Sequence, residues 1–339
     1  MPLLRSLLLA FLLTMLGQPL AFARQKNIFK IAFGSCSQQR DPDQMWADVI
    51  RQKPNLWMWV GDNVYADTHN MDSLRAYYAV QKKHPGYRQM LQSFPIIGIW
   101  DDHDYGMNDG GKFFSMKKGS KEQLLDFLDV PKNAEVRTHE GVYQSFLFEE
   151  GRIKIILLDT RYFRDTLFLS KEKGKKYTMN PEGDVLGEDQ WAWLEKELKN
   201  SKASLNIIAS SIQFLANEHI YEKWGNFPKA RQRMLDLLAR IKPTNTLFVS
   251  GDRHMAEISK MNLKGLSYPL YDFTSSGLTH TWSKPWIENN SLRVGGLVIQ
   301  KNYGLINVEW KEKGPVVTFQ ARGKNNMVYA EELIDFGNQ

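Results

Sequence analysis

Polar residues of the types that bind metal ions follow four apolar stretches of the chain. Each stretch is typical of a short buried strand, and each ends at a cluster of polar side chains. The clusters are Ser35-Cys36, Asp62-Asn63-Tyr65, Asp101-Asp102-His103-Asp104 and Asp252-Arg253-His254. Ligand and catalytic sites of open α/β sheets lie beyond the carboxyl ends of the strands. We therefore expect the four clusters to meet in space.

The chemistry of these clusters is that of a metal centre. Several carboxylates held close together are stable at neutral pH only if cations balance their charge. A thiolate with a phenolate favours a trivalent or soft transition metal, whereas carboxylate and amide oxygens suit calcium or magnesium. Each cluster alone also has a structural explanation: an Asx turn at Asp62, a helix cap at Asp101 or Asp102, or core packing of Cys36. Their shared position at strand ends favours a mixed metal centre.

The elements that would position these clusters alternate between strand and helix up to about residue 255. Predicted strands cover 28–34, 56–60, 95–100, 142–149, 153–158, 205–210 and 246–250, and predicted helices cover 41–52, 71–83, 119–128, 187–200 and 228–241. Strand patterns without intervening helices follow at 268–276, 295–300, 303–310, 315–322 and 327–334. This order predicts an α/β fold with a mixed two-sheet core and helices packed outside it.

The first residues have the pattern of a secretory signal. Arg5 precedes an apolar run over 7–16, and Ala21-Phe22-Ala23 fits an A-x-A cleavage site. The run is shorter than the roughly 20 apolar residues that a membrane span needs, and no later stretch is long enough. We expect residues 1–23 to be a signal peptide, residues 24–339 to form one domain, and the product to be secreted or periplasmic.

Composition narrows the possible partners. The chain has 339 residues, of which 42% are hydrophobic, so it can bury a sizeable core. Its net charge of +6 would favour anionic substrates, but no helix carries a basic stripe and no zinc-finger spacing occurs. We expect no stable complex with nucleic acid. Cys36 is the single cysteine of the chain, so it is an inert buried thiol, an intermolecular disulfide partner or a metal ligand.

The residues resemble the calcineurin-like metallophosphoesterase superfamily and, within it, the PhoD-like alkaline phosphatase (alkaline phosphatase D) family. Six stretches carry the resemblance, in this order: FGSC (33–36), GDNVYAD (61–67), WDDHDYGMND (100–109), LDTRYFRD (158–165), GDRH (251–254) and FTSSGLTH (273–280). It covers roughly residues 28–309 and implies two mixed β-sheets sandwiched between helices (αββα). Members often carry an N-terminal β-sandwich, for which the 24–27 stretch leaves no room, so we expect the catalytic domain alone.

The resemblance also implies a ligand set. Cys36 and Tyr65 would bind a ferric ion, and Asp62 would bridge two metals. Further ligands would be Asp102, Asp252 and His254. Fe³⁺ and Ca²⁺ are the implied cofactors, with other divalent metals as an alternative to calcium.

His103 and Arg161 are the candidate catalytic residues. His103 would protonate the leaving oxygen or donate a hydrogen bond to the phosphoryl oxygens. Arg161 follows Asp159 at another predicted strand end. It would hold the phosphoryl group through a bidentate contact, or it would pair with Asp159 or a neighbouring acid.

These inferences predict a secreted or periplasmic metal-dependent phosphatase that hydrolyses phosphate mono- or diesters by attack of a metal-activated hydroxide. Its substrates would be small phosphate esters or phospholipids. Two alternatives remain. One is a phosphodiesterase of the phospholipase or nuclease type. The other is a catalytically silent envelope protein that binds ligands and is stabilised by metals, against which the position of His103 beside Asp102 argues.

Overall fold

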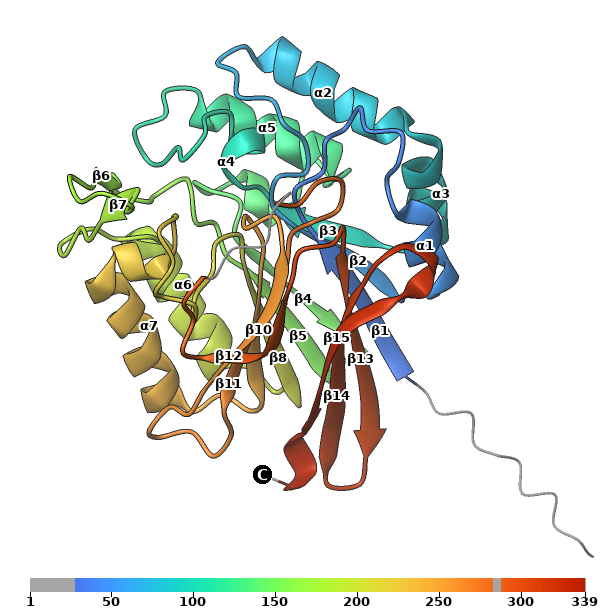
Figure 1. Cartoon of the computed structure of the whole chain (residues 1–339), viewed down its shortest axis with the longest axis vertical. Coiled ribbons are helices and arrows are strands. Elements are labelled where there is room, and N and C mark those ends of the chain that lie inside the picture. The colour runs from blue at the N-terminus through green and yellow to red at the C-terminus, as the bar shows by residue number, and fades with distance from the viewer. Residues whose placement is uncertain (1–27, 283–287, 339) are drawn as a thin grey trace, which may run out of the picture.

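The computed structural model describes residues 28–282 and 288–338, in which two mixed β-sheets form the centre of the molecule (Figure 1). The predicted signal peptide, residues 1–23, lies outside the described residues. Among the helices of the described ranges, none has both the length and the apolar character needed to cross a bilayer.

The first sheet has six strands in the order β15-β14-β13-β1-β2-β3. Its strands are β1 (Ile28–Gly34), β2 (Leu56–Val60), β3 (Ile96–Ile99), β13 (Tyr303–Lys311), β14 (Gly314–Arg322) and β15 (Val328–Asp335). β1, β2 and β3 run parallel, whereas β13 pairs with β1 in the antiparallel sense. The carboxyl ends of β1, β2 and β3 therefore lie together at one edge of the sheet.

The second sheet has seven strands in the order β12-β10-β11-β9-β8-β5-β4. Its strands are β4 (Gln144–Phe148), β5 (Ile153–Leu157), β8 (Leu205–Ser210), β9 (Thr246–Ser250), β10 (Ala256–Met261), β11 (Leu270–Ser275) and β12 (Arg293–Val298). The central strands β5, β8, β9 and β11 are parallel to one another. The outer strands β4, β10 and β12 each pair with their neighbours in the antiparallel sense. A separate hairpin pairs β6 (Phe168–Leu169) with β7 (Tyr177–Thr178).

Strand β2 is buried on both of its faces, to which successive side chains point in turn. On β2, Met58 points into the core between the sheets, whereas Trp57 and Trp59 point to the opposite face. There the two indoles pack edge-on against Trp46, with ring centroids 5.2 and 5.4 Å away. A strand buried on both faces is continuously apolar, which explains the sequence of β2.

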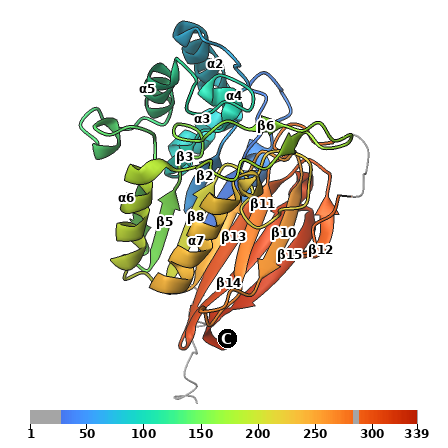
Figure 2. The ribbon, with the colours of Figure 1, turned by 90° about the vertical axis from the view of Figure 1, so that its left-hand side faces the viewer.

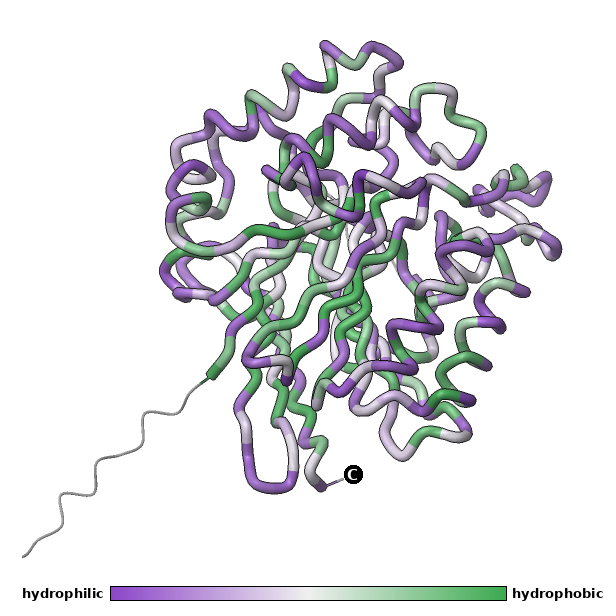
Figure 3. Tube along the Cα trace, turned by 180° about the vertical axis from the view of Figure 1, so that it is seen from behind, coloured by the Kyte–Doolittle hydropathy of each residue, from purple (hydrophilic) through white to green (hydrophobic). Residues whose placement is uncertain are grey.

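Helices cover the outer faces of both sheets. On the first sheet they are α1 (Trp46–Arg51), α2 (Met71–Lys83), α3 (Pro85–Ser93) and α5 (Lys117–Phe127), with the short α4 (Asp102–Tyr105) at its edge; on the second they are α6 (Gly187–Lys199) and α7 (Pro228–Ile241). Figure 2 shows α6 and α7 against β5 and β8. In Figure 3 the central strands are mainly hydrophobic, whereas the helices alternate between polar and apolar residues. The predicted αββα fold is confirmed.

Several elements differ from the sequence prediction. The first helix begins at Trp46, five residues later than expected, and α3 was not predicted. α3 begins at Pro85, the first helical position that proline favours, and the His84 side chain accepts a hydrogen bond from its first turn. β10 was also missed, because Glu257, Ser259 and Lys260 interrupt its apolar pattern.

Candidate metal centre

The four polar clusters meet at one edge of the stacked sheets. The backbone NH of Ser37, after β1, donates to the carbonyl of Asp62, after β2, at 3.0 Å. The backbone NH of His103, after β3, lies 3.4 Å from Asp62 Oδ1. The Tyr65 hydroxyl reaches His254, which follows β9 of the other sheet, at 3.0 Å. The expected convergence of the clusters is therefore found.

The first group of side chains contains sulfur, nitrogen and oxygen donors. Cys36, Asp62 and His254 each offer one atom, and these atoms lie within 4.8 Å of one another. The Cys36 thiol donates to Asp62 Oδ2 at 3.4 Å, and the Tyr65 hydroxyl lies 3.4 Å from the same oxygen. A thiol, a carboxylate, a phenol and an imidazole in one place suit a trivalent or soft transition metal.

Two further groups share members with the first. Asp62, Asp102 and His103 form the second group, and Asp101, Asp102 and Asp252 form the third, each with one atom per residue within 4.8 Å of the others. Asp62 thus belongs to two groups, and so does Asp102. Shared carboxylates are what a site with two adjacent metal ions requires.

The backbone at these residues is held in an unusual conformation. The φ angles are 61° at Cys36, 48° at Asp62, 70° at Asp252 and 54° at His254. For residues other than glycine, the left-handed region costs about 1–2 kcal/mol each. Strain of this kind gathers at functional sites, where the surrounding structure imposes it.

Burial controls the protonation of the first group. Burial, followed by the charge of Asp62, raises the pKa of the Cys36 thiol well above its usual value. Burial also raises the pKa of Asp62, although the charge of His103 acts in the opposite direction. The pKa values of Tyr65 and Asp252 are raised by burial as well. Without cations these groups hold their protons, so cation binding must release them. A bound cation would thus replace these protons and balance the negative charge of the deprotonated groups.

The carboxylates of Asp101 and Asp102 provide a test of whether the site fits a cation. Burial raises the pKa of Asp101 to about 7 against the effect of Arg161, whereas Arg161 and His103 outweigh burial and lower the pKa of Asp102 to about 2. Asp101 Oδ2 and Asp102 Oδ1 are buried and accept no hydrogen bond from the described residues. Because such oxygens are costly to leave unsatisfied, the residues fit a hard divalent cation such as calcium.

His103 is held beside Asp62 and Asp102 by two contacts. Its Nδ1 lies 2.7 Å from Asp67 Oδ2, and its ring packs on the Tyr65 ring with centroids 4.2 Å apart. Burial lowers the pKa of His103, but the charges of Asp62 and Asp102 and the hydrogen bond with Asp67 outweigh it and raise the pKa to about 11. The imidazole is therefore oriented by Asp67, and Nε2 is left for the site.

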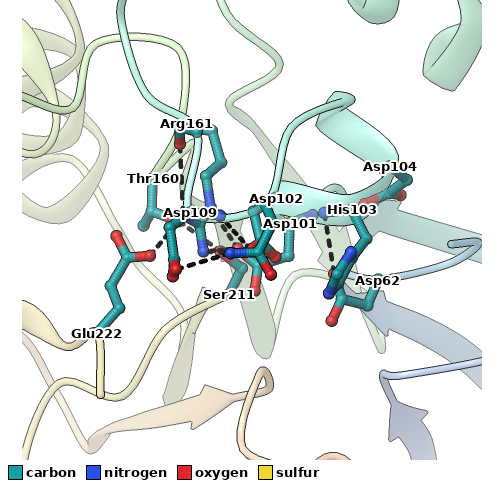
Figure 4. A network of polar contacts seen from close by, with 12 residues as sticks. Asp62, Asp101, Asp102, His103, Asp104, Asp109, Thr160, Arg161, Ser211 and Glu222 are labelled. Carbon is teal, nitrogen blue, oxygen red and sulfur yellow. Dashed lines mark hydrogen bonds and ion pairs between the residues drawn. The ribbon is translucent and has the colours of Figure 1, made fainter. Parts of the chain in front are cut away.

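Arg161 lies in a buried network of ion pairs. Its side chain is fully buried and forms ion pairs with Asp101 and, at 2.6 Å, with Glu222 Oε2 (Figure 4). Glu222 also binds Arg164 Nε at 2.9 Å. The guanidinium is 3.9 Å from Asp102 Oδ1. The observed contacts match the alternative of pairing with a neighbouring acid, and they position Asp101 beside the cluster.

Other residues near the cluster were not assigned a role from the sequence. His280 Nε2 lies 3.1 Å from the Tyr65 hydroxyl, and its Nδ1 lies 3.0 Å from Thr279 Oγ1. Ser211, after β8, donates to Asp101 at 2.6 Å. The signal for His280 was its place at the end of the FTSSGLTH stretch, whereas nothing in the sequence marked Ser211.

The stacked mixed sheets thus bring three overlapping groups of candidate metal ligands together at one edge. The model of the family described as PhoD-like phosphatase matches residues 31–283. The chain belongs to this PhoD-like phosphatase family. The expected resemblance to the PhoD-like family is confirmed. The roles of the individual ligands and of His103 and Arg161 stay predictions.

Individual relatives agree with this family. Alkaline phosphatase D of Bacillus subtilis (strain 168) is 23% identical over 280 residues, which are 68% of this chain and 47% of that protein. The chain thus spans about half the length of this curated relative. A structure of PhoD aligns with a TM-score of 0.72 and 17% identity, covering 91% of this chain and 68% of the other. A dimetal phosphatase from Danio rerio aligns with a TM-score of 0.56 and 14% identity, covering 91% of this chain and 99% of the other. Both likenesses concern the fold.

Proposed function

We propose that the chain is an exported metal-dependent phosphatase that hydrolyses phosphate mono- or diesters with a ferric ion and calcium. The observation that carries the proposal is the set of three ligand groups linked through Asp62 and Asp102. Cys36, Tyr65 and His254 would hold the ferric ion, and Asp102 and Asp252 would hold calcium. When bound, the ions supply Lewis-acid activation of a water molecule and neutralise charge on the phosphoryl oxygens.

His103 is the side chain that would donate a proton in the reaction. Asp67 binds Nδ1 of the ring and Tyr65 packs against its face, which fixes the direction of Nε2. A protonated imidazole held in this way can donate its Nε2 proton to the leaving oxygen of the ester. Such a donor has no use in a silent binding protein, so it favours an enzyme.

Arg161 would act indirectly. Its guanidinium binds Asp101, which lies in the third ligand group, and its other side binds Glu222. Holding Asp101 in one orientation positions a carboxylate toward the cation site. Arg161 would thus support the metal centre by fixing the position of Asp101.

The metal assignment is tested by elemental analysis together with the visible spectrum of the purified protein. A ferric ion bound by Tyr65 and Cys36 should absorb visible light by charge transfer. We expect about one iron per chain with calcium, and loss of the colour in Cys36→Ala. A colourless protein that holds no stoichiometric metal after reconstitution would refute the proposed centre.

The reaction is tested with a panel of substrates on the metal-loaded protein. Turnover of phosphate monoesters that disappears on metal removal and returns on reconstitution would support the phosphatase. Predominant turnover of diesters, such as phospholipids or nucleic-acid ends, would instead support a phosphodiesterase. No turnover of any phosphate ester by protein with full metal content would favour the silent binding protein.

Export is proposed from the N-terminal pattern of Arg5, the apolar run and Ala21-Phe22-Ala23. N-terminal sequencing of the protein recovered from a secreting host tests it. A mature chain that begins at Arg24 is the expected result. Recovery with Met1 still attached would contradict export through a cleaved signal.

A further inference from the structure

An apolar groove of about 390 Å³ lies between the loop that follows α4 and the β6–β7 hairpin. Met107, Phe113 and Leu169 line it and are exposed to 47%, 75% and 76% of their surface. Large apolar side chains gathered in one exposed place are typical of an interaction surface. These three residues are called the apolar patch below.

Lysines occur in the same two segments that carry the apolar patch. They are Lys112 on one side and Lys171, Lys173, Lys175 and Lys176 in the hairpin. Three acids lie among them: Asp165 pairs with Lys112, Glu172 with Lys175, and Asp109 with Lys176. Lys171 and Lys173 form no ion pair with the residues that the structure describes, and both are exposed. The two segments that border the groove therefore carry a positive excess.

The groove adjoins the candidate metal centre. Tyr177, from β7, lines the groove and donates its hydroxyl hydrogen to Asp109. The backbone NH of Asp109 in turn donates to Asp102 Oδ2 at 2.6 Å. Figure 4 shows Asp109 close to Asp102. In Figure 1 the hairpin projects from the body of the molecule, so its tip can reach a large flat partner.

We propose that the apolar patch and its lysines dock the protein on the surface of an anionic lipid bilayer. The exposed Phe113 and Leu169 side chains enter the boundary between head groups and acyl chains, and Lys171 and Lys173 contact the anionic head groups. Exposed aromatic and aliphatic side chains beside lysines are the combination that holds proteins at such interfaces.

A second copy of the chain is a less suitable occupant. In a two-fold dimer the same patch meets itself, so the lysines of one copy would face those of the other. Like charges brought together in this way oppose association. Anionic lipid, in contrast, complements both the apolar and the basic parts of the surface.

The test is co-sedimentation of the purified chain with phosphatidylglycerol–phosphatidylcholine vesicles and with phosphatidylcholine vesicles. We expect binding to the anionic vesicles. Phe113→Ser with Leu169→Ser should weaken it by at least about tenfold. Lys171→Glu with Lys173→Glu should weaken it by about fivefold or more for each lysine. Leu147→Ser on strand β4, where the side chain is 64% exposed far from the hairpin in sequence, is the matched control and should bind like the unaltered chain.

The outcomes separate the alternatives. No binding of the unaltered chain to anionic vesicles, equal binding to both vesicles, or full binding by the Phe113–Leu169 double variant would each overturn the proposal. So would a dimer, seen by sedimentation velocity, that the double variant dissociates while no vesicle is bound. Vesicle binding is read without any substrate, so it stands or fails separately from the proposed phosphatase activity. Thermal melting of each variant confirms that it is folded.

Discussion

The Tyr65 hydroxyl lies 3.0 Å from Nε2 of His254, although 189 positions separate the two residues in the sequence. Tyr65 follows β2 of the first sheet, and His254 follows β9 of the second. The contact therefore crosses from one sheet to the other. The metal centre is built across this boundary, so neither sheet alone can form it, and any change that alters how the sheets stack should also alter the site.

Gly61 is expected to tolerate no side chain. It connects β2 to Asp62 at φ 99°, and a Cβ atom there would lie 2.4 Å from Asp101 Cβ. Gly61→Ala should destabilise the fold by roughly 3 kcal/mol through backbone strain and overpacking, and it should lower metal content. Chemical denaturation and elemental analysis measure the two effects.

Gly151→Ala is the matched control, because its φ is 87° and a Cβ atom there would contact nothing within 4 Å. It should cost only the strain, about 1 kcal/mol, and should leave metal content unchanged. Equal losses in both variants would mean that contact with Asp101 contributes nothing.

The buried pairing of Glu222 with Arg161 and Arg164 should matter far more than ion pairs at the surface. All three side chains are at most 2% exposed. Glu222→Gln removes the charge that both guanidinium groups share, and breaking a buried pair costs about 3–5 kcal/mol. Urea denaturation at neutral pH measures this loss.

The exposed pair of Lys229 and Glu182 provides the comparison, since both side chains are at least 70% exposed. Glu182→Gln should change the free energy of unfolding by less than about 1 kcal/mol. A loss in Glu222→Gln no larger than this would show that the buried network adds little to stability.

His103 is predicted to act in the reaction without being needed to hold metal. His103→Ala should lower kcat by about 10²- to 10⁴-fold, with the metal content of the purified protein unchanged. Asp67→Ala frees the ring and should lower kcat by about tenfold. If His103→Ala instead loses metal, His103 is a ligand of the second group and its assignment as proton donor is wrong.

Much of the site could be predicted because strand ends are visible in a sequence. The apolar run into Gly61 and Asp62 indicates where β2 stops, and parallel strands bring their carboxyl ends together. The partners of the ligands could not be found in this way. Ser211 follows a strand in a different sheet, and its bond to Asp101 depends on how the sheets stack.

The role of Arg161 shows the same limit. Its position after a strand is equally compatible with a substrate-facing cation and with a buried counterion. The choice depends on Glu222, which lies 61 positions away in a loop without a clear pattern. Short-range sequence signals specify which residues reach the edge of the sheet, whereas long-range packing decides which way their side chains point.

His219 is expected to make stability depend on pH. It is buried, and neither ring nitrogen forms a hydrogen bond with the described residues. Burial, followed by the charges of Arg253 and Lys223, lowers its pKa well below the usual value. Below about pH 6.5 the unfolded chain binds a proton here that the folded chain does not. This histidine therefore reduces stability as the pH falls below that point, by about 1.4 kcal/mol per pH unit.

His219→Phe removes this proton uptake, so we expect the variant to lose less stability than the unaltered chain between pH 6 and pH 5. The difference between the two slopes should be about 1.4 kcal/mol per pH unit, measured by urea denaturation in one metal state. Equal slopes in the two proteins would show that the folded chain protonates His219 as easily as the unfolded chain does, through a partner or a water path that its burial conceals.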